Sequence, residues 1–191
     1  MADDEASWKR FEALAVPHLD AAYNLARWLV RHDADAQDAV HDAFVRAARY
    51  IDTFRGDNAR AWLLQIVRNT CYTWLRENRP AEMVDLGGDD ALLDVPAPAA
   101  DEPPAVAARK DDRARIDAAL GALPFAFREV VVLRELEDLA YKDIARIAEI
   151  PIGTVMSRLA RGRALLRDAL APGARPVLRP VPRPTQSGRT R

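Results

Sequence analysis

The chain has 191 residues, of which 49% are apolar and 30% are charged, and its formal net charge is −1 at pH 7. This length excludes a single large enzyme core and suits one ordinary domain or two small ones, and the apolar content excludes a wholly disordered chain. The small net charge hides an uneven distribution, because residues 81–108 contain acids and no Lys or Arg, whereas Asp168 is the single acid after Gly153 in an arginine-rich end.

Residues 7–80 are predicted to form a first helical domain. Apolar side chains from Trp8 to Leu29 recur at spacings of three and four residues, which is typical of one amphipathic helix. Asp33 or Asp35 is a candidate N-cap for the next helix.

The same apolar spacing continues over residues 36–47. The turn formers Gly56 and Asp57 then interrupt it. A third helix is expected to begin near Asn58 and to stop at Pro80, because proline disfavours helical backbone in the residue before it.

Two other segments have compositions that cannot bury a core. Residues 81–108 combine glycines and prolines with acids and alanines, and we predict a disordered acidic linker there. Fully extended, this linker could reach about 90 Å, so two domains joined by it could bind DNA sites more than two helical turns apart. Residues 171–191, rich in Pro and Arg, are predicted to be a disordered tail.

Residues 109–170 are predicted to form a second helical domain. Pro124 suits the first turn of its second helix. A short helix over 141–149, a tight turn over 150–153 and a longer basic helix that Thr154 caps follow in order. With no strand predicted, the expected fold is all-α: two small helical domains joined by a flexible linker.

A helix, a short turn and a basic helix together form the layout of a helix-turn-helix DNA reader. Val155, Leu159 and Leu166 share the face that would pack on the preceding helix. The residues expected to project toward base edges near the start of the basic helix are Thr154, Ser157, Arg158 and Arg161. Arg163 and Arg167 lie further along and suit phosphates. The alternative is a helical bundle with a solvated basic face, which the short turn and the scarcity of acids on this helix disfavour.

The expected compartment is the cytoplasm. Cys71 is the single cysteine, so it can supply neither an intramolecular disulfide nor a metal cage, which suits a reducing compartment. The N-terminal sequence is acidic, unlike a secretory signal. No segment approaches the roughly 20 apolar residues that span a bilayer, so no membrane insertion is expected.

The sequence disfavours two other classes of function. A metal-dependent enzyme could use His18, His32 and His41, but their spacing offers no pair at i and i+4 and no motif that joins a carboxylate to them. A stand-alone helix-turn-helix regulator would be expected to carry a ligand or phosphoacceptor domain, for which the first domain shows no signature. We therefore assign no catalytic residue, metal or cofactor.

Long runs of this sequence resemble a known family. Leu123-Pro124, Tyr141-Lys142-Asp143-Ile144-Ala145 and the run from Ile150 to Arg163 are similar to conserved region 4 of the extracytoplasmic-function (ECF) sigma factors, group IV of the sigma-70 family. Asp35 to Arg46 resembles the polymerase-binding helix of region 2. Ala61 to Asn69 resembles the helix behind the promoter-melting loop.

The resemblance implies a transcription initiation factor that binds core RNA polymerase and promoter DNA, is not an enzyme and is held by an anti-sigma factor. The implied polymerase-binding residues are Asp38, Asp42, Phe44 and Arg46. The implied minus-10 residues are Arg55, Asn58, Arg60, Arg68, Asn69 and Arg76, in a segment whose cations and aromatic rings suit single-stranded DNA. The six polar residues of the basic helix named above would read the minus-35 element. Trp62, Tyr72 and Trp74 are interpreted instead as core.

Overall fold

The computed structural model describes residues 2–79 and 109–171, and every regular element within them is a helix. The predicted linker, and all but the first residue of the predicted tail, lie outside the described residues. The first domain consists of α1 (Ala2–Ala15), η1 (Val16–His18), α2 (Leu19–Val30), α3 (Asp33–Tyr50), η2 (Ile51–Thr53) and α4 (Ala59–Asn78). The second consists of α6 (Arg109–Ala122), α7 (Phe125–Val131), the π-helical turn η4 (Val132–Leu136), α8 (Tyr141–Ala148) and α9 (Ile152–Leu170). The all-α prediction is confirmed. No described helix has the length and apolarity to cross a membrane.

The first domain packs α2, α3 and α4 around fully buried leucines such as Leu25 and Leu63. The single helix predicted up to Leu29 is wrong: α1 ends at Ala15, and Pro17 lies in the short 3-10 helix that separates α1 from α2. Proline has no backbone N–H to donate and its ring clashes with the preceding turn, so an α-helix does not continue through it unchanged.

The start of α4 agrees with the prediction, whereas the N-cap of α3 differs from it. Helix α4 begins next to Asn58, as predicted, and Asn58 is its N-cap, because its side-chain Oδ1 accepts a hydrogen bond from the backbone N of Ala61 at 2.9 Å. The N-cap of α3 is His32, so neither Asp33 nor Asp35 caps it. Both carboxylates lie instead in the first turn of α3, where they stabilise the positive end of the helix dipole.

The second domain has the predicted helix-turn-helix layout. Helix α8 ends at Ala148, and its C-cap Glu149 has a φ of 57°, in the left-handed region. The N-cap of α9 is the turn residue Pro151. Helix α9 thus begins at Ile152, and the prediction that Thr154 caps it is wrong. The turn is tighter than expected because the fixed φ of proline already suits the start of a helix. The inward face of α9 is as predicted, with Val155 and Leu159 buried.

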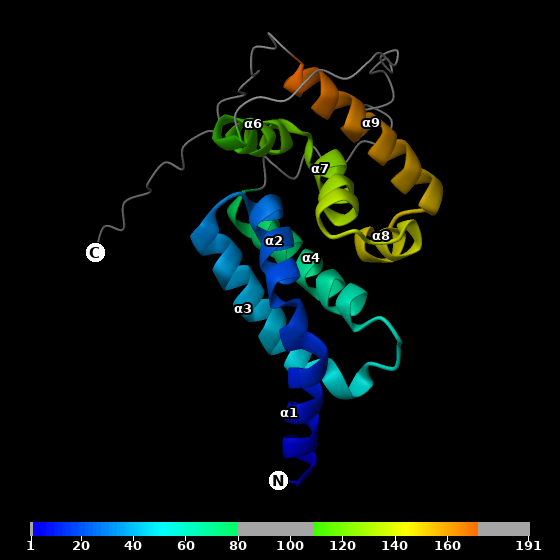
Figure 1. The fold of residues 1–191 in the computed structure, drawn as a ribbon. Coiled ribbons are helices and arrows are strands. Elements are labelled where there is room, and N and C mark those ends of the chain that lie inside the picture. The colour runs from blue at the N-terminus through cyan, green and yellow to red at the C-terminus, as the bar shows by residue number, and fades with distance from the viewer. Residues whose placement is uncertain (1, 80–108, 172–191) are drawn as a thin grey trace, which may run out of the picture.

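The two domains are packed against each other. Helix α4 lies along α8, and α2 contacts α7 (Figure 1). The buried apolar residues of both domains belong to one continuous cluster. We call this arrangement the closed form.

The close approach of α9 to α7 at Gly162 gives a test of the fold. A Cβ added at Gly162 of α9 would lie 2.7 Å from Val131 Cγ2 on α7, whereas one added at Gly153 would meet nothing within 4 Å. We expect Gly162→Ala to destabilise the protein by about 1–3 kcal/mol through overpacking. The control Gly153→Ala should be neutral or stabilising, because alanine favours helix over glycine. Thermal unfolding of the two variants checks this, and equal stabilities would contradict the described crossing.

Candidate functional site

The contact between the domains is built on a buried carboxylate, Glu129 of α7. Its side chain is almost wholly buried. Arg68 Nε donates to Glu129 Oε1 at 2.9 Å, and the Tyr72 hydroxyl lies 3.1 and 3.0 Å from the two carboxylate oxygens. Arg68 and Tyr72 lie one turn apart on α4 and so share a face. The Arg68 guanidinium lies 3.7 Å from the centre of the Tyr72 ring, which adds a cation–π contact.

Opposing forces act on the charge of Glu129. Burial raises the pKa of its carboxyl, and the neighbouring Arg68 guanidinium opposes that rise through its charge and its hydrogen bond. Tyr72 and the charge of Arg158 on α9 also favour the ionised carboxylate. Glu129 therefore accepts hydrogen bonds from two side chains of α4, and the positive charge of Arg158 on α9 also favours its ionised form.

A second buried acid, Glu137 after η4, holds the other end of the interface. Arg60, in the first turn of α4, donates to the Glu137 carbonyl oxygen at 2.7 Å and to its Oε2 at 2.5 Å. Asn24 Nδ2 of α2 donates to Oε1 at 2.5 Å. Hydrogen bonds between charged partners are stronger than neutral ones, so this acid ties both α2 and α4 to the second domain.

The end of α8 supplies further acceptors. Arg68 Nη2 donates to the backbone oxygen of Ala148 at 3.0 Å. Asn69 Nδ2 lies 3.3 Å from Glu149 Oε1, and Gln65 Nε2 lies 3.4 Å from the same oxygen. One face of α4 thus meets acids and a helix C-terminus along its length.

In the closed form some of the predicted minus-10 residues lie between the domains and others lie outside that interface. Arg60, Arg68 and Asn69 lie in the interface described above. Arg76 is exposed near the end of α4. Arg55 is also exposed, and its guanidinium donates to the backbone oxygens of Asp52 and Phe54. Asn58 caps α4. The closed form therefore does not unite these residues on one open surface.

The aromatic residues of α4 pack as expected. Trp62, Tyr72 and Trp74 are partly buried against the apolar cluster. The ring of Trp62 lies 5.0 Å from that of Phe54. Tyr72 has a polar contact as well, since its hydroxyl reaches Glu129.

The predicted minus-35 residues also differ in their surroundings. Ser157 is exposed, and its hydroxyl donates to the backbone oxygen of Thr154 at 3.0 Å. Arg158 is turned inward enough for its Nε to be buried. Arg163 Nη2 lies 2.6 Å from Glu135 Oε1, and this hydrogen bond raises the pKa of Arg163. Arg161 is partly exposed and Arg167 is exposed in the last turn of α9.

The residues predicted to bind polymerase lie on α3. Asp38, Asp42 and Arg46 are exposed and follow each other at one-turn spacing, so they share one face of the helix. Phe44 is partly buried, with its ring edge-on to that of Phe11 at 6.0 Å. Phe44 therefore packs α3 against Phe11 of α1 and does not share the exposed position of the other three residues.

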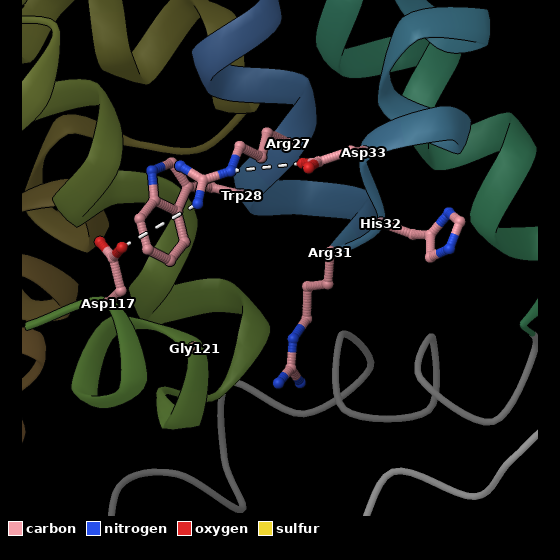
Figure 2. Close-up of a pocket in the computed structure, with 7 residues that line it drawn as sticks. All are labelled: Arg27, Trp28, Arg31, His32, Asp33, Asp117 and Gly121. Atoms are coloured by element: carbon pink, nitrogen blue, oxygen red, sulfur yellow. Dashed lines mark ion pairs between the residues drawn. The ribbon is translucent and has the colours of Figure 1, made fainter. Parts of the chain in front are cut away.

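An open hollow lies where the end of α2 meets α6. Its volume is about 420 Å³, and its lining residues are Arg27, Trp28, Arg31, His32, Asp33, Asp117 and Gly121. Arg27 spans it, 3.5 Å from Asp33 and 4.0 Å from Asp117 (Figure 2). These ion pairs are largely exposed, and such pairs contribute little to stability. In the described part of the chain, no cluster of three or more His, Cys, Asp or Glu residues could hold a metal.

The sequence reasoning missed two sets of residues. Glu129 and Glu137 were not singled out, although an acid within the apolar run of α7 requires a buried partner and could have served as a signal. Ile152 and Met156 were also missed. Their side chains are 51% and 54% exposed at the start of α9, one turn apart.

Both domains match known family models, and the chain is similar to known sigma factors over most of its length. The family model "Sigma-70 region 2" matches residues 14–80, and "Sigma-70, region 4" matches residues 113–166. The chain is 37% identical to the RNA polymerase sigma-H factor of Pseudomonas aeruginosa, over 74% of this chain and 76% of that protein. It is 32% identical to the ECF RNA polymerase sigma-E factor of Escherichia coli K12, over 86% and 88% of the two chains.

Two solved structures are similar across both domains. The first is the sigma factor RpoE in complex with the anti-sigma factor NepR from Bartonella quintana, with a TM-score of 0.65, 28% identity and coverage of 85% of this chain and 97% of that one. The second is CnrH in complex with the cytosolic domain of CnrY, with a TM-score of 0.57, 25% identity and coverage of 87% and 95%.

Proposed function

The chain belongs to the sigma-70 family as an RNA polymerase sigma factor of the ECF type, and we propose that its first domain binds core polymerase and the minus-10 strand while its second reads the minus-35 element. The observation that carries this division of labour is the helix-turn-helix of α8 and α9, placed beside a first domain whose helix α4 carries a row of cations. The factor itself catalyses nothing and acts in the cytoplasm.

The polymerase-binding surface is the outer face of α3. Asp38, Asp42 and Arg46 present charges there at one-turn spacing, which suits a charged, complementary face on the large subunit of the polymerase. Phe44 supports this helix through its contact with Phe11.

We assign the minus-10 surface to the loop before α4 and to α4 itself. Arg55 and Arg76 are exposed in the closed form, and we assign them, together with Asn58, to contacts with an unstacked strand. Arg60, Arg68 and Asn69 carry the donors that a strand backbone needs, but acids of the second domain hold them in the closed form. Binding of the minus-10 strand by the full set therefore requires the domains to separate.

The minus-35 surface is the start of α9. We assign contacts with base edges in the major groove to Thr154, Ser157, Arg158 and Arg161. Arg163 and Arg167 suit the phosphate backbone. Ile152 and Met156 add apolar contacts to the C5-methyl groups of thymines, because an exposed apolar pair on a reading helix matches that group.

We also propose that an anti-sigma factor regulates this chain. The support is that both similar solved structures are described as complexes, one of them explicitly with an anti-sigma factor. The direct test of the proposed function is run-off transcription with purified core polymerase and a promoter placed upstream of this protein's own gene. A transcript that requires both proteins is expected. Tight, specific DNA binding by the free chain would instead favour a stand-alone regulator.

The arginines of α9 should differ in what they read. Arg161→Ala should weaken binding of the holoenzyme to its minus-35 element by about 1–3 kcal/mol and relax the preference at one base pair. Arg167→Ala should weaken binding to all sequences alike and reduce the salt slope by about one unit. Filter binding to single-base promoter variants across salt concentrations separates the two effects. Equal, sequence-independent losses would show that α9 only clamps phosphates.

The apolar contact of Met156 can be tested by removing single methyl groups from the DNA. Replacing minus-35 thymidines one at a time with deoxyuridine deletes only the C5-methyl group. At one position we expect holoenzyme affinity to fall about fourfold, the equivalent of burying one methylene. In Met156→Ala that sensitivity should disappear. If the variant and the wild-type protein respond alike to uridine at every position, Met156 does not read a methyl group.

A further inference from the structure

Helix α1 lies against the loop that joins α3 to α4, residues 51–58, which belongs to the surface that we assign to the minus-10 strand. We infer that α1 positions this loop through Ser7 and Arg10, and that Arg10 is thereby a positioning residue for base selection in the minus-10 element. This inference rests on the proposed role of the loop in DNA binding, and it assigns no DNA contact to α1 itself.

Two side chains of α1 reach the loop. The Ser7 hydroxyl donates to Asp52 Oδ2 at 2.7 Å, and Arg10 Nη2 donates to the backbone oxygen of Phe54 at 2.7 Å. Ser7 and Arg10 lie three positions apart, so they project from the same side of the helix. The partners are 45 and 44 positions apart in the sequence. These hydrogen bonds are therefore tertiary contacts that join α1 to the loop at two successive points.

The Phe54 carbonyl is the point at which α1 and the loop's own contacts meet. Residues 54–58 lie outside any helix. The backbone N of Phe54 donates to the Ile51 oxygen at 3.2 Å, and the Arg55 guanidinium donates to the backbone oxygens of Asp52 and Phe54. The Phe54 oxygen thus accepts hydrogen bonds from Arg10 of α1 and from Arg55 of the loop. Removal of Arg10 would leave this turn held by local contacts alone.

The side chain of Phe54 is held from the other direction. It is 9% exposed, and its ring lies 5.0 Å from that of Trp62 on α4. Gly56 approaches the same ring closely, because a Cβ added there would lie 3.1 Å from Phe54 Cε2. Residues 55–57 are all exposed. Helix α4 therefore fixes the ring of Phe54 and α1 fixes its carbonyl, and the exposed tip of the loop follows directly after this residue.

Such a contact has a specific consequence for base selection. A group that selects a base must be held in one arrangement by supporting contacts, and contacts made before the strand arrives reduce the cost of ordering the loop on binding. The hydrogen bond from Arg10 is charge-assisted and so stronger than a neutral one. A loop released from α1 would keep its cations but lose its fixed geometry. Loss of Arg10 should therefore weaken discrimination between bases more than general affinity for single-stranded DNA.

The test compares variants of two neighbouring cations of α1. Arg10→Met removes the guanidinium and keeps an aliphatic side chain, whereas Arg10→Lys retains a cationic donor. Lys9→Met is the matched control: it removes the same charge from the next residue of the helix, whose side chain is 71% exposed and paired with Glu5. The full chain is assayed in complex with core polymerase. The probes are single-stranded oligonucleotides that carry the minus-10 element of the promoter upstream of this protein's own gene, with each base replaced in turn. Discrimination is the ratio of the affinities for the original and the replaced probe.

We expect Arg10→Met to lower discrimination about tenfold at one minus-10 position, the lower end of what a hydrogen bond to a charged group contributes. Affinity for core polymerase should stay unchanged. Arg10→Lys should recover part of the discrimination, and Lys9→Met should match the wild-type chain. A uniform loss of affinity with unchanged discrimination in Arg10→Met, or equal discrimination in Arg10→Met and Lys9→Met, would overturn the inference.

Arg55→Ala, in the loop itself, separates the inference from the proposed function. If Arg55→Ala lowers discrimination and Arg10→Met does not, the loop selects the base and α1 does not position it. If neither variant changes discrimination, the proposed DNA-binding role of the loop fails as well.

Ser7→Ala provides an independent variant that leaves Arg10 intact. It removes only the hydroxyl that donates to Asp52, and it should lower discrimination at the same position by a smaller factor. Circular dichroism shows whether each variant keeps its helices. If Arg10→Met loses its helical structure, Ser7→Ala decides the question, and wild-type discrimination in this variant would overturn the inference.

Discussion

A buried carboxylate that must be paired is the constraint on which the closed form depends. Glu129 lies in the apolar face of α7, and an ionised carboxylate without partners there would be far too costly to bury. Its hydrogen-bond partners come from α4 of the other domain: the Arg68 guanidinium and the Tyr72 hydroxyl. Helix α4 must therefore lie against α7 and α8 in one register. The remaining contacts, from Glu137 to the end of α8, are compatible with that register.

Local pattern predicted most of the fold. The apolar spacing along α9 identified Val155 and Leu159 as its buried face, and the turn formers Gly56 and Asp57 indicated that the next helix begins near Asn58. The errors were local as well. Spacing alone does not reveal the break at Pro17, because apolar residues continue in phase on both sides of it. The start of α9 at Ile152 depends on backbone geometry set by Pro151, which a search for hydroxyl caps overlooks.

The site was less predictable than the helices, because its decisive contacts join distant parts of the chain. Arg68 and Glu129 are 61 positions apart, and no periodicity connects them. The sequence distinguished the arginines of α9 by helix position, yet Arg158 faces the buried acid whereas Arg163 pairs with Glu135. These differences arise from the contacts that α9 makes with α7 and η4 within the second domain. The resemblance identified which residues to consider, and the tertiary contacts indicate which of them the closed form leaves accessible.

The two domains of the free chain pack against each other, and we infer that core polymerase separates them. The most direct test is single-molecule energy transfer between dyes on cysteines introduced at two exposed positions, Ala34 of α3 and Ala169 of α9, after replacement of the buried Cys71 by serine. We expect one narrow population for the free chain and a shift to a longer distance when core polymerase is added. A broad distribution in the free chain, as for two domains on a loose tether, or a distance that polymerase leaves unchanged, would contradict it.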